Sequence, residues 1–267
     1  MFPSHDQNAH SNSCSRCVDG WWNGRSVRRE KTQSLNKGMK SFQNFLTEDT
    51  DSLEGYLTEF QNALVSTHDR VNMNGHTMFL PKNENSSFPN KMIVSCFHGD
   101  EPAGWLGLLE FVKKYNVDSV NVSYLPIISG DVFRSGKHLN EDGENPNLMV
   151  SSQPSKEMKR LLETKDMWLP RASDGFLDLH EDPWRGEGYV FSWSDTGDLT
   201  DRMVENLSRY FPLFNKGVLL EDPQDMLGEY LARFGVSPSI THETPVLDHE
   251  LEERIEATIL AIKEFLS

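Results

Sequence analysis

The chain has 267 residues, of which 37% are hydrophobic and 10% aromatic, and this composition is enough for a sizeable core. A disordered protein is therefore excluded. The 26 basic and 41 acidic side chains give a formal net charge of −15. Because so acidic a surface repels phosphate backbones and anionic lipids, we expect neither nucleic acid nor a membrane surface as a partner.

Residues 1–40 are polar, rich in Ser, Asn, Arg and Gly, and show neither helical nor strand periodicity. We interpret them as an N-terminal extension of a domain that spans residues 41–267. The extension holds Cys14 and Cys17, but no second cysteine pair follows at zinc-finger spacing, so ordinary thiols are expected there.

Three cysteines in the whole chain argue against a disulfide scaffold and favour a reducing compartment. Residues 1–10 lack the basic segment and apolar run of a signal peptide, and no stretch reaches the roughly 18 apolar residues of a membrane span. We therefore expect a cytoplasmic protein.

The first predicted helix begins at Asp51, because Asp51 to Glu54 resembles a capping box and apolar residues then recur on one face. Hydrophobic patterning further along the chain predicts strands over residues 92–97, 120–127, 175–180, 188–193 and 236–241, and helices over residues 103–115, 154–165, 199–211, 223–233 and 248–266. Pro154 is expected in the first turn of its helix. Strands that alternate with helices predict an α/β domain with a mostly parallel or mixed sheet.

Three of the predicted strands lead into residues that can carry chemistry, namely His98, His180 and Glu243. Ligands of open α/β sheets bind beyond the carboxyl ends of the strands. Side chains far apart in the sequence are therefore expected to meet at one edge of the sheet.

The spacing of His98 and Glu101, three residues apart across a strand-to-helix turn, lets an imidazole and a carboxylate face one point. Pro102 suits the first position of the following helix. Catalytic zinc needs about three protein ligands and an open position for water, and two histidines with one glutamate are a known set. His180 supplies the second histidine, and Glu243 is the carboxylate best placed to take a proton from water.

Four segments together carry a family resemblance: HGDEPAG at 98–104, HLNEDGENPN at 138–147, DGFLDLHED at 174–182 and THETP at 241–245. From about Met92 to the C terminus the chain resembles the zinc carboxypeptidase family of the pancreatic type, near its bacterial aspartoacylase and succinylglutamate desuccinylase branch. The resemblance implies a mixed, twisted sheet of about eight strands flanked by helices.

The resemblance also implies roles for individual residues. His98, Glu101 and His180 match the ligands of one zinc ion. Glu243 matches the glutamate that activates the attacking water and then protonates the leaving amine.

The segment at 138–148 departs from the family pattern in three places. His138 replaces the arginine that helps to hold the oxyanion, and Leu148 replaces the arginine that binds the substrate carboxylate. Asn145 replaces the aspartate that orients a zinc histidine. A protonated His138 can still donate to an oxyanion, whereas Leu148 cannot bind a carboxylate.

Several other residues are candidates for the site, and some of them have two interpretations. The family pattern retained at Asn140, Gly143 and Asn147 makes the two asparagines candidates for substrate binding. Arg134 is a further candidate, although this cation and the nearby Lys137, Arg171 and Arg185 also suit a solvated surface. Tyr189 is either a substrate-capping tyrosine or a core side chain. His242 should point to the face opposite Glu243, and Cys96 is expected to be a buried thiol.

The sequence thus predicts a zinc-dependent metallohydrolase that cleaves an amide bond in a short peptide or an N-acyl amino acid, with Glu243 as general base and acid and His138 supporting the developing charge. The alternative is a metal-bearing binding protein with little activity, because both family arginines are missing. A deacylase whose substrate is not an amino acid is a third possibility, and the sequence does not indicate the oligomeric state.

Overall fold

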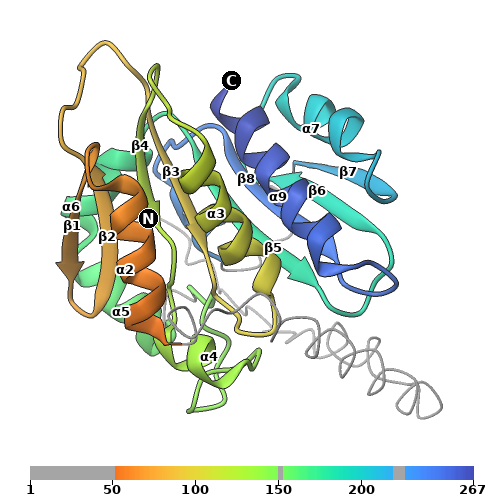
Figure 1. The fold of residues 1–267 in the computed structure, drawn as a ribbon, viewed down its shortest axis with the longest axis horizontal. Coiled ribbons are helices and arrows are strands. Elements are labelled where there is room, and N and C mark those ends of the chain that lie inside the picture. The colour runs from red at the N-terminus through yellow and green to blue at the C-terminus, as the bar shows by residue number, and fades with distance from the viewer. Residues whose placement is uncertain (1–51, 150–152, 219–225) are drawn as a thin grey trace, which may run out of the picture.

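The computed structural model of the protein describes residues 52–149, 153–218 and 226–267 (Figure 1). The predictions for residues 1–40, for Cys14 and Cys17, and for Asp51 lie outside the described residues. Helix α2 (Leu53–Leu64) follows Ser52, whose hydroxyl accepts a hydrogen bond from the Gly55 amide at 2.9 Å. The helix therefore has its cap one residue later than predicted.

A hairpin that we did not predict follows α2. Strands β1 (His68–Met73) and β2 (His76–Pro81) pair antiparallel around Asn74 and Gly75, where φ is 50° and 93°. An Asn-Gly pair favours this two-residue turn, because both positions need a positive φ to match the twist of the strands. The turn signal was present in the sequence.

Eight strands form one mixed sheet in the order β1-β2-β4-β3-β5-β8-β6-β7. Strands β4, β3, β5 and β8 run parallel in the centre, while β2 and β6 pair antiparallel on either side of them. The mixed α/β fold that the sequence predicts is therefore confirmed. The strands beyond the hairpin are β3 (Asn90–Ser95), β4 (Asn121–Leu125), β5 (Phe176–Asp182), β6 (Gly188–Ser192), β7 (Leu213–Val218) and β8 (Ser239–Pro245), of which β7 was not predicted.

Helices cover both faces of the sheet. One face packs against α2, α3 (Pro102–Lys114), α7 (Leu199–Leu207) and α9 (Leu251–Leu266), and the other packs against α5 (Lys156–Glu163), α6 (Lys165–Trp168), the 3-10 turn η2 (Leu169–Ala172) and α8 (Leu227–Arg233). The short helix α4 (Gly130–Ser135) follows β4. Ser155 caps α5, so Pro154 precedes the helix and its expected place in the first turn is wrong.

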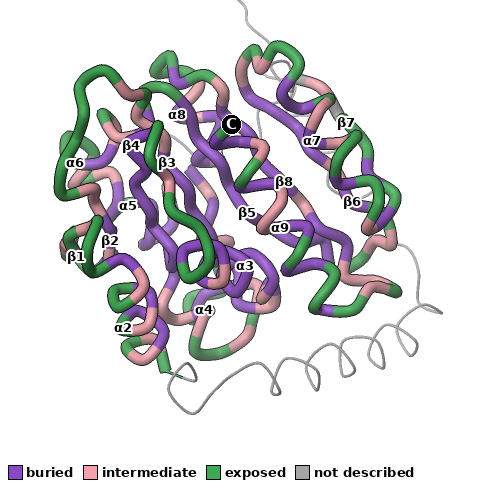
Figure 2. The backbone as a smooth tube through the Cα atoms, turned by 45° about the horizontal axis from the view of Figure 1, so that its top comes forward, coloured by how far each residue is buried: buried purple, intermediate pink, exposed green. Residues whose placement is uncertain are grey.

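Each face of the sheet has its own apolar core. The central strands that lie between the two cores are mostly buried (Figure 2). Strand β5 is buried along its whole length, as expected of a parallel strand covered on both faces. Among the helices of the described residues, none is both long and apolar enough to cross a bilayer.

The strand boundaries change one detail of the expected site. His98 lies three residues beyond the end of β3, but His180 and Glu243 lie inside β5 and β8 rather than after them. The two residues are register partners on neighbouring parallel strands. The sheet itself therefore places them side by side.

Candidate metal centre

The turn between β3 and α3 is shaped by its own sequence. A Cβ atom on Gly99 would lie 1.8 Å from the Val132 carbonyl oxygen, so only glycine fits there. The Gly99 amide donates to the Lys137 carbonyl at 2.8 Å, which joins the turn to the next loop. Pro102 occupies the first turn of α3 as predicted, and Glu101 precedes it at the N-cap. The turn therefore fixes the backbone position from which the Glu101 side chain extends.

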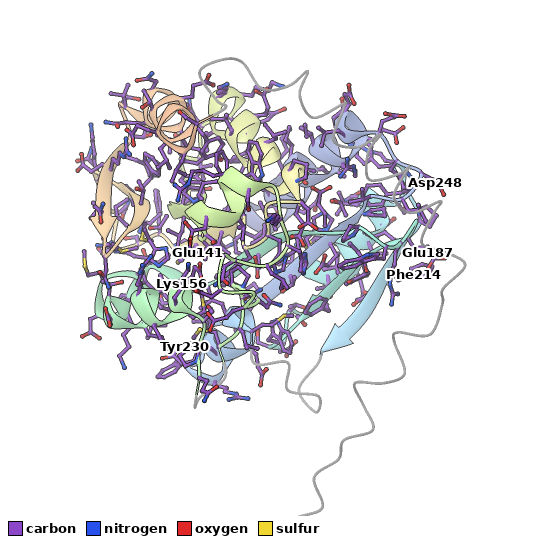
Figure 3. The ribbon with its side chains drawn as sticks, turned by 90° about the horizontal axis from the view of Figure 1, so that it is seen from below. Glu141, Lys156, Glu187, Phe214, Tyr230 and Asp248 are labelled. Carbon is purple, nitrogen blue, oxygen red and sulfur yellow. The ribbon has the colours of Figure 1, made fainter. Side chains whose placement is uncertain are left out.

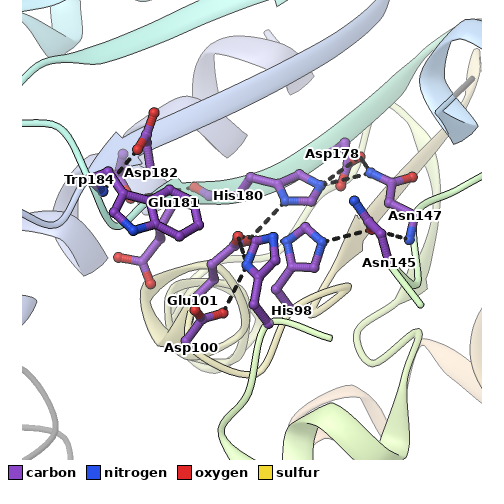
Figure 4. A network of polar contacts seen from close by, with 12 residues as sticks. His98, Asp100, Glu101, Asn145, Asn147, Asp178, His180, Glu181, Asp182 and Trp184 are labelled. Atoms are coloured by element: carbon purple, nitrogen blue, oxygen red, sulfur yellow. Dashed lines mark hydrogen bonds and ion pairs between the residues drawn. The ribbon is translucent and has the colours of Figure 1, made fainter. Parts of the chain in front are cut away.

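The carboxylate of Glu101 lies between two imidazoles (Figure 4). Its Oε1 is 2.6 Å from Nδ1 of His98, and its Oε2 is 2.8 Å from Nδ1 of His180. All three residues are buried, with exposed fractions of 4%, 3% and 4% for His98, Glu101 and His180. Three donor groups from two separate segments thus converge as the sequence predicts.

The far side of each imidazole faces another acceptor. Nε2 of His98 lies 3.0 Å from Oδ1 of Asn145, and Nε2 of His180 lies 3.0 Å from Oδ2 of Asp178. A neutral imidazole that donates through Nε2 carries a lone pair on Nδ1, so both lone pairs are aimed at the Glu101 carboxylate. Such an arrangement needs either two extra protons or one cation between the three groups. The donor set therefore fits a divalent metal ion.

The charges of the cluster favour an ionised carboxylate beside a protonated imidazole. Burial acts to raise the pKa of Glu101, but His98 and His180 outweigh it and hold the pKa well below its usual range. Burial acts to lower the pKa of His180, but the carboxylates of Asp178 and Glu101 raise it well above the usual value. A bound metal ion must therefore displace a proton from this cluster.

We expect zinc binding to the apoprotein to release at least one proton at about pH 7, because His180 binds its proton above the ordinary pKa of 6.5 and must lose it to bind zinc. Zinc affinity should accordingly fall as the pH is lowered. Titration calorimetry in two buffers of different ionisation enthalpy measures the released protons. Equal heats in both buffers, with an affinity that does not change between about pH 6 and pH 8, would contradict the charge state described here.

Glu243 lies beside this cluster, between His180 on β5 and Tyr189 on β6. Burial raises the pKa of Glu243 well above its usual range, and although His180 lowers it, the negative charges of Glu101 and Asp182 raise it further. The carboxyl group is therefore suited to accept and hold a proton close to the cluster.

The His138 side chain lies directly beside two of the ligand candidates, His98 and Glu101. Its ring stacks on that of His98 with centroids 3.7 Å apart, and its Nδ1 lies 3.2 Å from Asp100 and 3.7 Å from Glu101. Donor atoms of His98, Glu101 and His138 all lie within 4.8 Å of one another. Burial acts to lower the pKa of His138, but Asp100 and Glu101 outweigh it, so the pKa is raised above 6.5.

The asparagines of the loop before α5 take structural contacts. Asn147 donates through Nδ2 to Oδ2 of Asp178 at 3.4 Å, lies 3.2 Å from Nε2 of His180, and accepts from the Leu227 amide at 3.2 Å. Asn140 donates to the buried carboxylate of Glu157 at 3.0 Å and accepts from the amides of two loop residues, Asp142 and Glu144. These contacts shape the loop that brings His138 and Asn145 to the cluster.

Lys156 anchors the same loop from the start of α5. Its Nζ lies 2.6 Å from Glu141, 2.8 Å from Asp131 and 3.2 Å from Asp142. Glu141 and Lys156 are labelled next to each other in Figure 3. A surface hollow of about 370 Å³ opens beside the loop, with Arg134, Lys137, Leu139 and Asn140 among its lining residues. The lining includes none of the three ligand candidates.

Three of the four expected cations form ion pairs within the protein. Arg134 pairs with Asp131 at 2.7 Å and its side chain is 58% exposed, while Arg171 pairs with Glu84. Arg185 contacts Asp182 at 3.2 Å and lies over the ring of Tyr189. Leu148, partly buried next to Asn147, carries no charge that replaces the family arginine.

Tyr189 shares the Glu243 side of the sheet and donates its hydroxyl to Asp182 at 3.1 Å. Burial, with the charges of Glu243 and Asp182, raises its pKa, so the hydroxyl remains a donor. His242 is fully buried, and burial lowers its pKa to about 3, so it stays neutral. Cys96 is a buried thiol, as the sequence predicts.

Sequence reasoning missed Asp178, the partner of His180 within the same strand. Alternation along β5 places residues 178 and 180 on one face, which was the available signal. The pattern Asp-x-His was visible, but the direction in which each side chain points depends on the strand assignment.

Solved structures resemble this protein over most of its length. A protein from Shewanella denitrificans OS217 that is assigned as a metallopeptidase aligns with a TM-score of 0.74 and 26% identity, covering 80% of this chain and 89% of its own. A metallo-carboxypeptidase from Burkholderia cenocepacia aligns with a TM-score of 0.64 and 17% identity, covering 83% and 69%.

A metallo-carboxypeptidase from Pseudomonas aeruginosa, in complex with (2-guanidinoethylmercapto)succinic acid, aligns with a TM-score of 0.61 and 15% identity, covering 80% of this chain and 70% of its own. No protein-family model matches the chain, and no curated protein matches it either. The eight-stranded mixed sheet is that of the metallocarboxypeptidases, and the resemblance to zinc carboxypeptidases is confirmed. The fold and the histidine-glutamate cluster support a metal-dependent hydrolase.

Proposed function

We propose that this protein is a zinc-dependent hydrolase that cleaves an amide bond in a short peptide or an N-acyl amino acid. The observation that carries the proposal is the position of the Glu101 carboxylate between the Nδ1 atoms of His98 and His180, at 2.6 Å and 2.8 Å. Two imidazoles and one carboxylate are a ligand set of catalytic zinc, and they leave a position open.

In this proposal His98, Glu101 and His180 hold one zinc ion. Zinc supplies a Lewis acid that polarises a carbonyl group and lowers the pKa of a water molecule to about 7. Asn145 and Asp178 accept hydrogen bonds from the Nε2 atoms of the two histidines, so each imidazole keeps Nδ1 directed towards the ion.

Glu243 carries the proton transfers. Its carboxylate removes a proton from the attacking water and then delivers a proton to the nitrogen of the leaving amine. The raised pKa suits the second step, because a carboxyl group with an ordinary pKa gives up its proton too easily to serve as the acid at neutral pH. The first step needs the ionised carboxylate, and a positive charge beside it, such as that of His180, favours this form.

His138 supports the negative charge that develops on the carbonyl oxygen. The hydrogen bond to Asp100 and the charge of Glu101 favour its protonated form, which donates to an anion. We further propose that Tyr189, Asn147, Asn140 and Arg134 contact substrate. Tyr189 has the strongest support of these, because it is the register partner of Glu243.

A small substrate is supported by the ligand of the Pseudomonas aeruginosa neighbour. Leu148 offers no cation to a substrate carboxylate, so recognition of that group must come from another side chain. The small number of cysteines supports a cytoplasmic setting for the reaction.

The test is a metal assay joined to an activity screen. The purified protein should carry about one zinc ion per chain and hydrolyse members of a panel of short peptides and N-acyl amino acids. A chelator should remove the activity, and added zinc should restore it. Hydrolysis that continues unchanged after complete removal of the metal would overturn the proposal.

A second candidate, a metal-bearing binding protein with little hydrolytic activity, is favoured by His138. Its imidazole lies near the donor atoms of His98 and Glu101, where it can occupy the position that water needs. A zinc-loaded protein that binds members of the panel without hydrolysing them supports this candidate over the first.

A further inference from the structure

A buried ion pair lies directly behind the metal centre. Glu181 of β5 and Arg254 of α9 contact each other through Oε1 and Nη1, with exposed fractions of only 1% and 2%. The removal of two charges from water has a large unfavourable free energy that their mutual attraction offsets only in part, so a pair at this depth is weak evidence for stability alone. The position of this ion pair beside the metal centre points to a role other than stability.

The second oxygen of Glu181 holds the first turn of α3. Oε2 accepts a hydrogen bond from the Ala103 amide at 2.6 Å. The first four amides of a helix have no partner within the helix, and Ala103 follows the N-cap residue Glu101 by two positions. A Cβ atom on Gly104 would lie 2.9 Å from the Leu179 carbonyl, so this turn of α3 also packs closely on β5.

Glu181 is therefore linked to two ligand candidates through the backbone. It follows His180 directly in β5, and it fixes the turn that begins at Glu101. Because side chains alternate along a strand, Glu181 points to the opposite face from His180, towards α3 and α9. It acts on the metal centre without touching it.

We propose that Glu181 and Arg254 are positioning residues that hold Glu101 and His180 at the separation that a shared metal ion requires. The inference rests on the proposed function, since it assigns these two residues a role towards the same metal centre. Arg254 keeps Glu181 anchored while Glu181 binds the Ala103 amide, so α9 sets the geometry of ligands that it does not contact.

The experiment compares Zn²⁺ affinity, measured by competition with a chromogenic chelator, and the visible spectrum of the Co²⁺-substituted protein. For Arg254→Met we expect Zn²⁺ to bind about 10- to 100-fold more weakly, as for other residues that orient metal ligands, and the Co²⁺ bands to shift. Arg254→Lys keeps one cationic donor and should retain the wild-type spectrum.

Two further variants separate positioning from stability. The double variant Glu181→Leu with Arg254→Met removes both charges, which avoids an unpaired buried ion, but it still leaves the Ala103 amide without its acceptor. It should therefore fold and still bind Zn²⁺ weakly. Ile262→Ala removes a fully buried side chain from another position of α9, and it should lower stability while leaving Zn²⁺ affinity unchanged.

Wild-type affinity and an unchanged Co²⁺ spectrum in the folded double variant would overturn the positioning role. So would an equal loss of affinity in Ile262→Ala, because the effect would then follow stability alone. A wild-type protein that binds no Zn²⁺ is a different outcome, and it overturns the proposed function itself.

Discussion

Replacement of Glu243 by glutamine is expected to lower turnover by about 10²- to 10⁴-fold, the usual contribution of a positioned general acid and base, while zinc stays bound. Glutamine has nearly the same shape as glutamate but cannot take a proton from water or return one to the leaving amine. The metal content should remain at the wild-type level, because His98, Glu101 and His180 are intact. Steady-state kinetics on any substrate found in the panel measures the loss.

The same variant has an expected effect on stability. The folded apoprotein raises the pKa of Glu243 above the unfolded value of 4.5, so this carboxyl group costs stability once the pH rises past that value. Apo Glu243→Gln should therefore melt at a higher temperature than the apo wild type at neutral pH. The expected rise is about 2–4 °C for each kcal/mol of stability that ionisation of Glu243 costs, and the difference should vanish below about pH 4.

Equal turnover in the Glu243→Gln variant and the wild type would exclude Glu243 as the proton carrier and would favour the binding protein.

The second large effect is expected from His98→Ala or His180→Ala, each of which should weaken zinc binding by more than about 100-fold. A change in a residue that only orients a ligand already costs about 10- to 100-fold, and loss of the ligand costs more. Each variant also leaves the Glu101 carboxylate without one of the two imidazoles that lower its pKa.

The matched control for these variants is His68→Ala, because His68 lies on β1 and its Nε2 contacts the Val122 carbonyl, away from the cluster. We expect it to retain zinc. Metal analysis after dialysis reads out all three variants. Full zinc occupancy in His98→Ala and in His180→Ala would remove these two residues from the ligand set.

Local features of the site were predictable from the sequence. The turn from His98 to Pro102 is encoded by neighbouring residues, since Gly99 permits the close approach to Val132 and Pro102 starts the helix. His180 and Glu243 could be expected nearby because parallel strands in one sheet share an edge.

Contacts between distant segments were not predictable in the same way. Nothing near Glu181 marks Arg254 as its partner, because the two are 73 residues apart and meet only when α9 packs on β5. The stacking of His138 on His98 likewise depends on how the 136–149 loop is anchored by Lys156. The missed hairpin is different, since the Asn74-Gly75 signal was local and was overlooked.

The most direct test of the shared-ion geometry is X-ray absorption at the zinc edge of the purified full-length protein. We expect two imidazole nitrogens at about 2.0–2.1 Å and carboxylate oxygen at about 2.0–2.2 Å from the zinc ion. Sulfur scatterers at about 2.3 Å would place the ion at cysteines such as Cys14 and Cys17 instead. That result, or a first shell without imidazole, would contradict a metal centre formed by His98, Glu101 and His180.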